Sequence, residues 1–180
     1  MELAKALDVR KGVTAIIGAG GKTTLLLALA PMAGAEGDLF FVAVNDTIPV
    51  TLTSLPYTSG GVVYVPYTAF DARPGGVVSA YNATAQTFVL FTKDSRLVFD
   101  LATGETSDEN QNTSTQTALF RNGLLYIPLI FCASHFGLKV SMLESQDGYP
   151  VLRFTTGSEV YDDSLFIEKA ENLIAYRVAQ

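Results

Sequence analysis

The chain has little of the residues on which metal, redox and nucleophilic chemistry usually depend. Of its 180 residues none is tryptophan, one is cysteine (Cys132) and one is histidine (His135). A single cysteine excludes an intrachain disulfide, and copper sites need several imidazole or sulfur ligands. We therefore expect no bound copper or other cofactor, and we interpret Cys132 and His135 as packing residues rather than a ligand pair.

Charge is also scarce, and its sign excludes one class of partner. Charged residues make up 17% of the chain, and the formal net charge is −6. Because residues 1–35 carry a net +2, the remaining residues carry −8. An acidic surface repels phosphate backbones, so we expect no nucleic-acid partner. No apolar run reaches the ~20 residues that cross a bilayer, so we expect no integral membrane segment.

One six-residue phrase occurs twice. GVVYVP at Gly61–Pro66 returns as GLLYIP at Gly123–Pro128, 62 residues later, and the same offset pairs Gly75 with Gly137. Agreement over such a stretch indicates an internal duplication. Proline cannot donate to a strand ladder but can begin a helix, so each phrase predicts a strand that ends in a short helix closed by glycine. We expect structural roles for Gly61, Tyr64, Pro66, Gly123, Tyr126, Pro128 and Gly137.

The apolar pattern predicts an α+β fold of antiparallel sheets and short helices in two pseudo-repeated halves. A helical turn is expected at 67–72, a helix at 129–136, and an exposed loop or hairpin tip at 103–117. Pro49 predicts that its strand lies at an edge or at a bulge. The expected strands are 39–44, 47–52, 62–65, 77–81, 87–92, 96–101, 124–127, 139–143 and 151–155.

The end of the chain predicts an amphipathic helix. Asp162, Asp163 and Ser164 supply helix-capping side chains. One apolar face follows at helical spacing: Phe166, Ile167, Ala170, Leu173, Ile174 and Val178. We divide the chain into a leader (1–36) and a domain (37–180), with halves at about 39–102 and 103–162 and a closing helix at 163–178.

The doubled phrase resembles the copper amine oxidase N-terminal-like domain, the stalk module of bacterial cell surfaces. Tyr64-Val-Pro-Tyr67 and Tyr126-Ile-Pro-Leu129 match its paired phrases, although the arginine usual after Val-Pro-Leu and the acidic residue of the following helix are missing. The resemblance spans about residues 39–162 and implies no catalysis and no copper, which belongs to another domain of that family. It implies a non-catalytic, extracellular or cell-surface module, which acts in binding or spacing on cell-wall polysaccharide or another surface protein.

A different function is indicated near the start of the chain. The glycine-rich stretch Gly18–Thr24 follows a β-prone run and precedes a helical one, a geometry in which backbone N–H groups close around phosphate. The strict phosphate-loop pattern requires glycine where Ile16 stands. Residues 6–24 resemble the opening of the selenium-dependent hydroxylase accessory protein family, a P-loop-like group. The alternative is thus a cytoplasmic nucleotide-binding accessory protein that uses Gly18, Gly20, Gly21, Lys22 and Thr23, with Asp46 as the metal carboxylate.

Export is the competing interpretation of the same segment. The apolar run that begins at Leu25 leads to Ala33-Gly34-Ala35, which matches the small-residue cleavage site of a secretory signal. One hypothesis is that a P-loop-like start is joined to the remains of a signal peptide. Another is that the segment is an N-terminal extension without a role.

The tyrosines also have two interpretations. Tyr64, Tyr67, Tyr81 and Tyr126 are candidates for an aromatic platform that stacks on glycan rings, or for the edge of a core.

Overall fold

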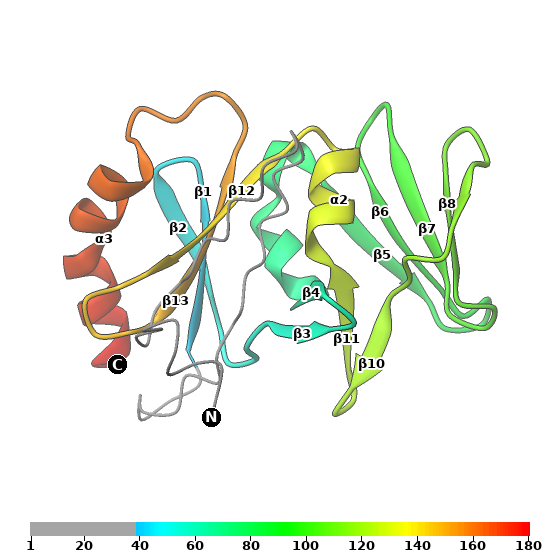
Figure 1. The fold of residues 1–180 in the computed structure, drawn as a ribbon, viewed down its shortest axis with the longest axis horizontal. Helices are drawn as coiled ribbons and strands as arrows, with labels where there is room; N and C mark the ends of the chain where they lie inside the picture. The colour runs from blue at the N-terminus through cyan, green and yellow to red at the C-terminus, as the bar shows by residue number, and fades with distance from the viewer. Residues whose placement is uncertain (1–38) are drawn as a thin grey trace, which may run out of the picture.

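The computed structural model describes residues 39–180, which form three β-sheets and a few short helices (Figure 1). The α+β class and the C-terminal helix are therefore as predicted. The predicted leader (1–36) lies outside the described residues, and so do Gly18, Gly20, Gly21, Lys22 and Thr23.

The first sheet has the strand order β12-β13-β1-β2. The strands β1 (Phe40–Val44) and β2 (Thr47–Leu52) form the predicted antiparallel hairpin, and β2 lies at the edge, as Pro49 predicts. β12 (Lys139–Glu144) pairs in the antiparallel sense with β13 (Pro150–Thr155), but β13 runs parallel to β1. The sheets are antiparallel, as predicted, except at this junction, where a long connection brings β13 back alongside β1 in the same direction.

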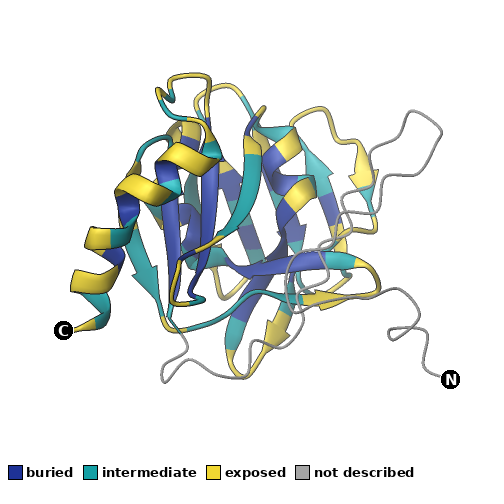
Figure 2. Ribbon diagram, turned by 60° about the vertical axis from the view of Figure 1, so that its left-hand side comes forward, coloured by how far each residue is buried: buried dark blue, intermediate teal, exposed yellow. Residues whose placement is uncertain are grey.

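β1 is buried on both faces, which explains its uninterrupted apolar sequence. Phe40 and Val42 belong to the main core, which lies between this sheet and the rest of the molecule. Phe41 and Ala43 point to the opposite face and pack in a second, smaller core beneath α3 (Asp163–Val178). The burial colours of Figure 2 show this central strand region covered on both sides.

The second sheet has the order β10-β11-β4-β3, and the two copies of the doubled phrase form its centre. β4 (Val62–Pro66) and β11 (Leu124–Pro128) pair so that Tyr126 lies opposite Pro66 and Pro128 opposite Tyr64. The pairing of the two strands is thus symmetric about the central pair, Ile127 and Val65. The duplication of the chain stays a prediction, but its two phrases meet as direct neighbours.

Two outer strands of this sheet were not predicted. β3 (Tyr57–Ser59) and β10 (Leu119–Arg121) each form a hairpin with the strand that follows. The linking residues are Gly60–Gly61, with φ of 56° and 78°, and Asn122–Gly123, with φ of 51° and 80°. Both pairs have the positive φ that tight type I′ turns require.

Each phrase leads into helical structure, as predicted. Tyr67–Ala72 (η1) forms a 3₁₀ helix, followed by a further short turn at Pro74–Gly76 (η2), and Leu129–His135 (α2) forms an α-helix. Gly137 ends α2 with φ of 67°, and the next N–H group, that of Leu138, donates to the carbonyl of Ala133 at 2.8 Å. This is the left-handed glycine cap expected at a helix end.

The third sheet contains five consecutive antiparallel strands. They are β5 (Val78–Asn82), β6 (Thr87–Phe91), β7 (Arg96–Asp100), β8 (Glu105–Asp108) and β9 (Thr113–Ser114). The region 103–117 therefore forms the hairpin β8–β9, which extends the sheet.

The closing helix α3 has the predicted bounds. The Asp162 side chain caps it by accepting a hydrogen bond from Leu165 N at 2.8 Å. Phe166, Ala170 and Ile174 are buried, but Leu173 is 40% exposed, so its assignment to the buried face is wrong. Successive helix positions are turned by about 100°, and Leu173 consequently lies on the flank of the helix.

Candidate functional site

The most chemically suggestive cluster in the described residues surrounds the single histidine. His135 lies in the last turn of α2, Ser95 in the β6–β7 turn and Glu109 in the β8–β9 turn. Ser95 Oγ is 2.7 Å from His135 Nε2, and Glu109 Oε2 is 3.2 Å from both atoms. The structure therefore joins a hydroxyl, an imidazole and a carboxylate from three separate segments.

The geometry of this cluster differs from that of a catalytic triad. In a triad the carboxylate holds Nδ1, which leaves Nε2 free to accept the serine proton. Here Ser95 and Glu109 both contact Nε2. Ser95 Oγ can donate its one proton to Glu109 Oε2 or to Nε2, and the tautomer of His135 determines which atom donates in the 2.7 Å contact. Because Glu109 shares Nε2 with Ser95, the carboxylate does not hold the ring from the opposite nitrogen as it does in a triad.

The charge of Glu109 is reinforced by its surroundings. Hydrogen bonds from backbone N–H groups, its own and that of Arg96, hold the pKa of the Glu109 carboxyl below its usual value. The carboxylate can thus stay ionised and tie the β8–β9 turn to α2. The cluster acts as a polar tie between three turns.

Cys132 does not join His135 at a shared site. It is fully buried in the main core, and burial raises the pKa of its thiol. Within residues 39–180, no group of three or more His, Cys, Asp or Glu side chains is arranged to hold a metal ion.

A second polar cluster surrounds Arg153, which is 1% exposed. Its guanidinium donates to Asp46 Oδ1 at 2.9 Å and to Asp163 Oδ1 at 2.6 Å. It also donates to the carbonyls of Asn45 and Tyr161, at 2.8 and 2.6 Å. Arg153 therefore connects β13, the β1–β2 turn and the first turn of α3.

This network corrects the role predicted for Asp46. Its carboxylate accepts from the N–H groups of Val160 and Tyr161 as well as from Arg153. Desolvation opposes ionisation, but these N–H groups and the positive charge of Arg153 prevail and lower the pKa of Asp46. Both carboxylate oxygens of Asp46 accept hydrogen bonds, so in this structure Asp46 is the ion-pair partner of Arg153.

A small open pocket lies beside this network, where α3 meets the β1–β2 hairpin. Its volume is about 150 Å³, and its lining includes the apolar side chains of Ile48, Tyr161 and Leu173. Asp46 contributes to its lining, but its carboxylate is already paired with Arg153. Thr47 and Lys169 also line it, so the pocket has walls of mixed polarity.

The two tyrosines of the doubled phrase pack inside the protein and do not form an exposed binding platform. Tyr64 and Tyr126 are 8% and 7% exposed, and their rings surround Tyr57 at centroid distances of 5.4 and 4.9 Å. The guanidinium of Arg121 covers the Tyr57 ring at 4.4 Å. Desolvation raises the pKa of Tyr57 and Tyr64. A buried stack of this kind cannot receive a sugar ring, so the glycan-platform interpretation of Tyr64 and Tyr126 is wrong.

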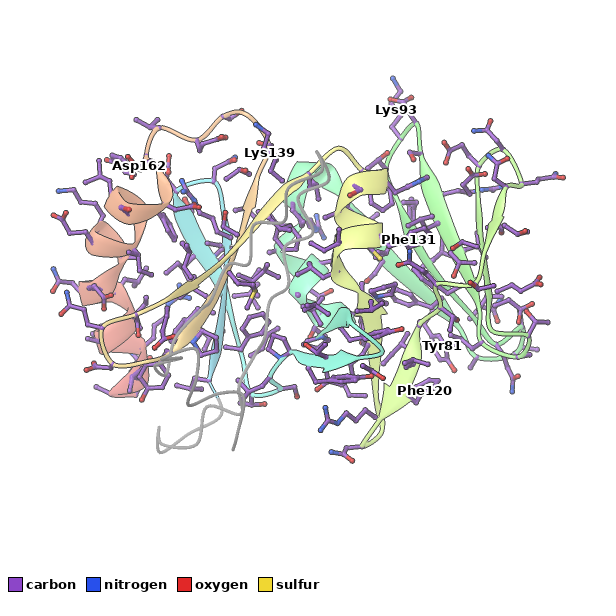
Figure 3. All side chains as sticks on the ribbon, in the orientation of Figure 1. Tyr81, Lys93, Phe120, Phe131, Lys139 and Asp162 are labelled. Atoms are coloured by element: carbon purple, nitrogen blue, oxygen red, sulfur yellow. The ribbon has the colours of Figure 1, made fainter. Side chains whose placement is uncertain are left out.

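Tyr81 differs from these residues. It is 56% exposed on β5, while Phe120 on β10 is 60% exposed. Both project from the lower part of the molecule in Figure 3. Phe91 on β6 is 39% exposed. These three aromatic side chains of the second and third sheets are exposed enough to contact a ligand.

Several of these residues gave no signal in the sequence. Ser95 and Glu109 are 40 and 26 residues from His135, and Arg153 is 107 residues from Asp46. No local motif links such pairs. Tyr57, in contrast, precedes a Gly-Gly turn and a predicted strand, which is the pattern of a hairpin.

Within residues 39–180, no helix has the length and apolar character needed to cross a membrane. In comparisons with known proteins, no family model, no curated protein and no solved structure matches this chain.

Proposed function

We propose that this chain is a non-catalytic module of the bacterial cell surface or cell wall, which acts in binding or spacing. The observation that supports this proposal is the position of the doubled phrase in the fold. Its tyrosines and prolines are buried, and its two copies pair with each other at the centre of a sheet. The motif on which the stalk-domain resemblance depends thus builds a scaffold, and side chains of the second and third sheets, such as Phe120 and Tyr81, stay exposed for contact.

The chemistry of the polar clusters supports the same proposal. Ser95, Glu109 and His135 contact one another through a single imidazole nitrogen, and Asp46 and Asp163 are paired with Arg153. Such internally paired groups stabilise a shape and leave little capacity for proton transfer or metal binding.

Sedimentation with purified peptidoglycan and wall polysaccharide tests the binding role. We expect part of the protein to sediment with the wall material, and Tyr81→Ala and Phe120→Ala to reduce that fraction because these rings are exposed. Tyr176→Ala, a change at a 63% exposed tyrosine on α3, is the matched control. If all variants stay in the supernatant with the unsubstituted protein, a polysaccharide ligand is excluded, and spacing or protein docking remains.

Export is tested in the native host. We expect the protein in the extracellular or wall fraction, with a mature N-terminus near Glu36. A protein that retains Met1 in the cytoplasmic fraction would contradict the proposed location.

Nucleotide binding is the second candidate, and it depends on the stretch Gly18–Thr24. Binding with ligand at 1,000 times Kd adds about 4 kcal/mol to stability. Thermal unfolding with and without Mg-ATP or Mg-GTP therefore distinguishes the candidates. A shift that Lys22→Ala abolishes would favour the nucleotide-binding protein, and no shift would remove it. The pairing of Asp46 with Arg153 weighs against this candidate, because the carboxylate it requires is occupied.

A further inference from the structure

The outer face of the third sheet has an apolar centre that the described residues leave at least partly exposed. Strand residues alternate between faces, and Phe88, Leu90, Leu97 and Phe99 point into the main core. Their neighbours, among them Val89, therefore point outward, away from both cores. We define the outer face by the outward residues of β5 to β8: Val78, Ala80, Asn82, Thr87, Val89, Phe91, Arg96, Val98, Asp100, Glu105 and Ser107.

The strand register arranges this face in three rows across the sheet. The central row is Ala80, Val89, Val98 and Ser107. One flanking row runs from Val78 through Phe91 to Arg96, and the other from Asn82 through Thr87 and Asp100 to Glu105. An apolar centre is thus bordered by a positive charge on one side and two negative charges on the other.

Both kinds of charge are available to a partner. Arg96 and Glu105 are exposed, and neither side chain forms an ion pair with another described residue. Asp100 is partly exposed, accepts hydrogen bonds from Ala102 and Thr103 N–H at Oδ1, and forms no ion pair with another described residue.

We propose that the outer face is a self-association surface, on which a second copy of this chain packs face to face. A two-fold axis along the central row places Val89 and Val98 against their own counterparts. The same rotation exchanges the two flanking rows, so Arg96 of each copy lies over Asp100 and Glu105 of the other. The two valines of the central row therefore meet each other, and the flanking rows are complementary in charge, as an isologous interface requires.

The shape and chemistry of the face favour this partner over a sugar. Two β-sheets pack with their faces about 10 Å apart through interdigitating small and branched side chains, such as those of the central row. Sugar stacking needs aromatic rings, and Phe91 is the single ring on this face. The face is small for a permanent interface, so we expect a weak dimer with Kd between about 10 µM and 1 mM.

Sedimentation equilibrium of the full chain across this concentration range tests the proposal. We expect a monomer–dimer equilibrium that Val98→Glu abolishes, because it places like charges at the centre of the interface. Val160→Glu is the matched control, since Val160 is 81% exposed in the loop before α3 and should leave the dimer intact. Circular dichroism checks the fold of each variant, and if Val98→Glu is unfolded, Phe91→Ser takes its place.

A charge exchange tests the orientation. Arg96→Glu alone and Glu105→Lys alone should each weaken the dimer about tenfold, or about 1.4 kcal/mol, and the double variant should regain most of the lost affinity. Asp100 is left unchanged because it caps a turn. A monomer at every concentration, or a dimer that Val98→Glu and Phe91→Ser leave unchanged, would overturn the proposal.

Discussion

At the scale of single residues, Tyr126 is a buried side chain with one hydrogen bond. It is 7% exposed, its ring packs against Tyr57, and its hydroxyl donates to the Leu55 carbonyl at 3.3 Å. Truncation to alanine leaves a cavity as large as the ring, so Tyr126→Ala should lower the free energy of unfolding by about 3 kcal/mol or more. Urea unfolding followed by circular dichroism measures this loss.

The matched variant of Tyr126 separates packing from the hydrogen bond. Tyr126→Phe keeps the ring and removes the hydroxyl, so it should cost about 1 kcal/mol or less. A loss below about 1 kcal/mol for Tyr126→Ala would show that this tyrosine is a surface feature and that its core assignment is wrong.

Asp46 should make stability depend on pH. Its folded-state pKa is lowered, so the unfolded chain binds a proton more readily. The stabilising contribution is therefore fully present above the ordinary aspartate pKa of about 3.9. It is lost as the pH falls through the lower folded-state value. Urea midpoints measured between pH 6 and pH 2.5 should decrease toward acid.

Asp46→Asn isolates this contribution. The variant should be less stable than the unsubstituted protein at pH 6 and should lose less stability on acidification, because its side chain does not titrate. Asp94→Asn, at an exposed turn, controls for the loss of a surface carboxylate. Identical pH profiles for Asp46→Asn and the unsubstituted protein would show that the contacts with Arg153 and the two N–H groups do not favour the charged form.

Individual side-chain partners were the least predictable part of the molecule. The position of Asp46 after a strand was visible in the sequence, and so was its place in a turn. Its partner Arg153 was not, because only the return of β13 alongside β1 brings the guanidinium there. Ser95 and Glu109 reach His135 in the same way, through the sheet register of distant strands.

Helices and strands were more predictable than side-chain partners wherever the local sequence determines their bounds. The Asn45-Asp46 turn between two apolar runs predicted the β1–β2 hairpin, and the capping side chains predicted the bounds of α3. The strands β3 and β10 were missed because each is three residues long and partly polar. Their signal was the pair of turn residues that follows each strand.

Those two turns allow a test at the scale of the hairpin. Gly60 and Asn122 occupy equivalent turn positions with φ of 56° and 51°, and a Cβ atom at Gly60 would meet no atom within 4 Å. Asparagine tolerates this conformation and restricts the unfolded chain more than glycine does. Gly60→Asn should therefore raise the free energy of unfolding by about 0.5 kcal/mol in urea melts.

The control for this turn is a side chain that left-handed backbone disfavours. Gly60→Val should destabilise the protein by about 1 kcal/mol or more, since a β-branched residue is strained at positive φ. If Gly60→Asn destabilised the protein to the same extent, the turn would not have the conformation described for it.

The arrangement of the whole molecule could not be predicted from local pattern. The sequence places the halves at 39–102 and 103–162, yet the first sheet combines β1 and β2 with β12 and β13, and the second combines strands from both halves as well. The parallel pairing of β1 with β13 depends on this exchange. Alternation along a strand shows which face is apolar, but it does not show which distant strand will cover its edge.

This interleaving predicts that the molecule unfolds as one unit. The main core takes side chains from both halves, among them Phe40, Phe99, Ile127 and Phe154, so neither half can bury its apolar surface alone. The chain has eight tyrosines and no tryptophan, so tyrosine fluorescence and far-ultraviolet circular dichroism are the two probes. Their urea transitions should coincide, as two-state unfolding requires. A fragment of residues 39–102 should stay unfolded, because β1 and β4 would each lose the neighbour from the other half. Two separate transitions, or a folded fragment, would mean that the halves are independent domains and that the shared sheets contribute little to stability.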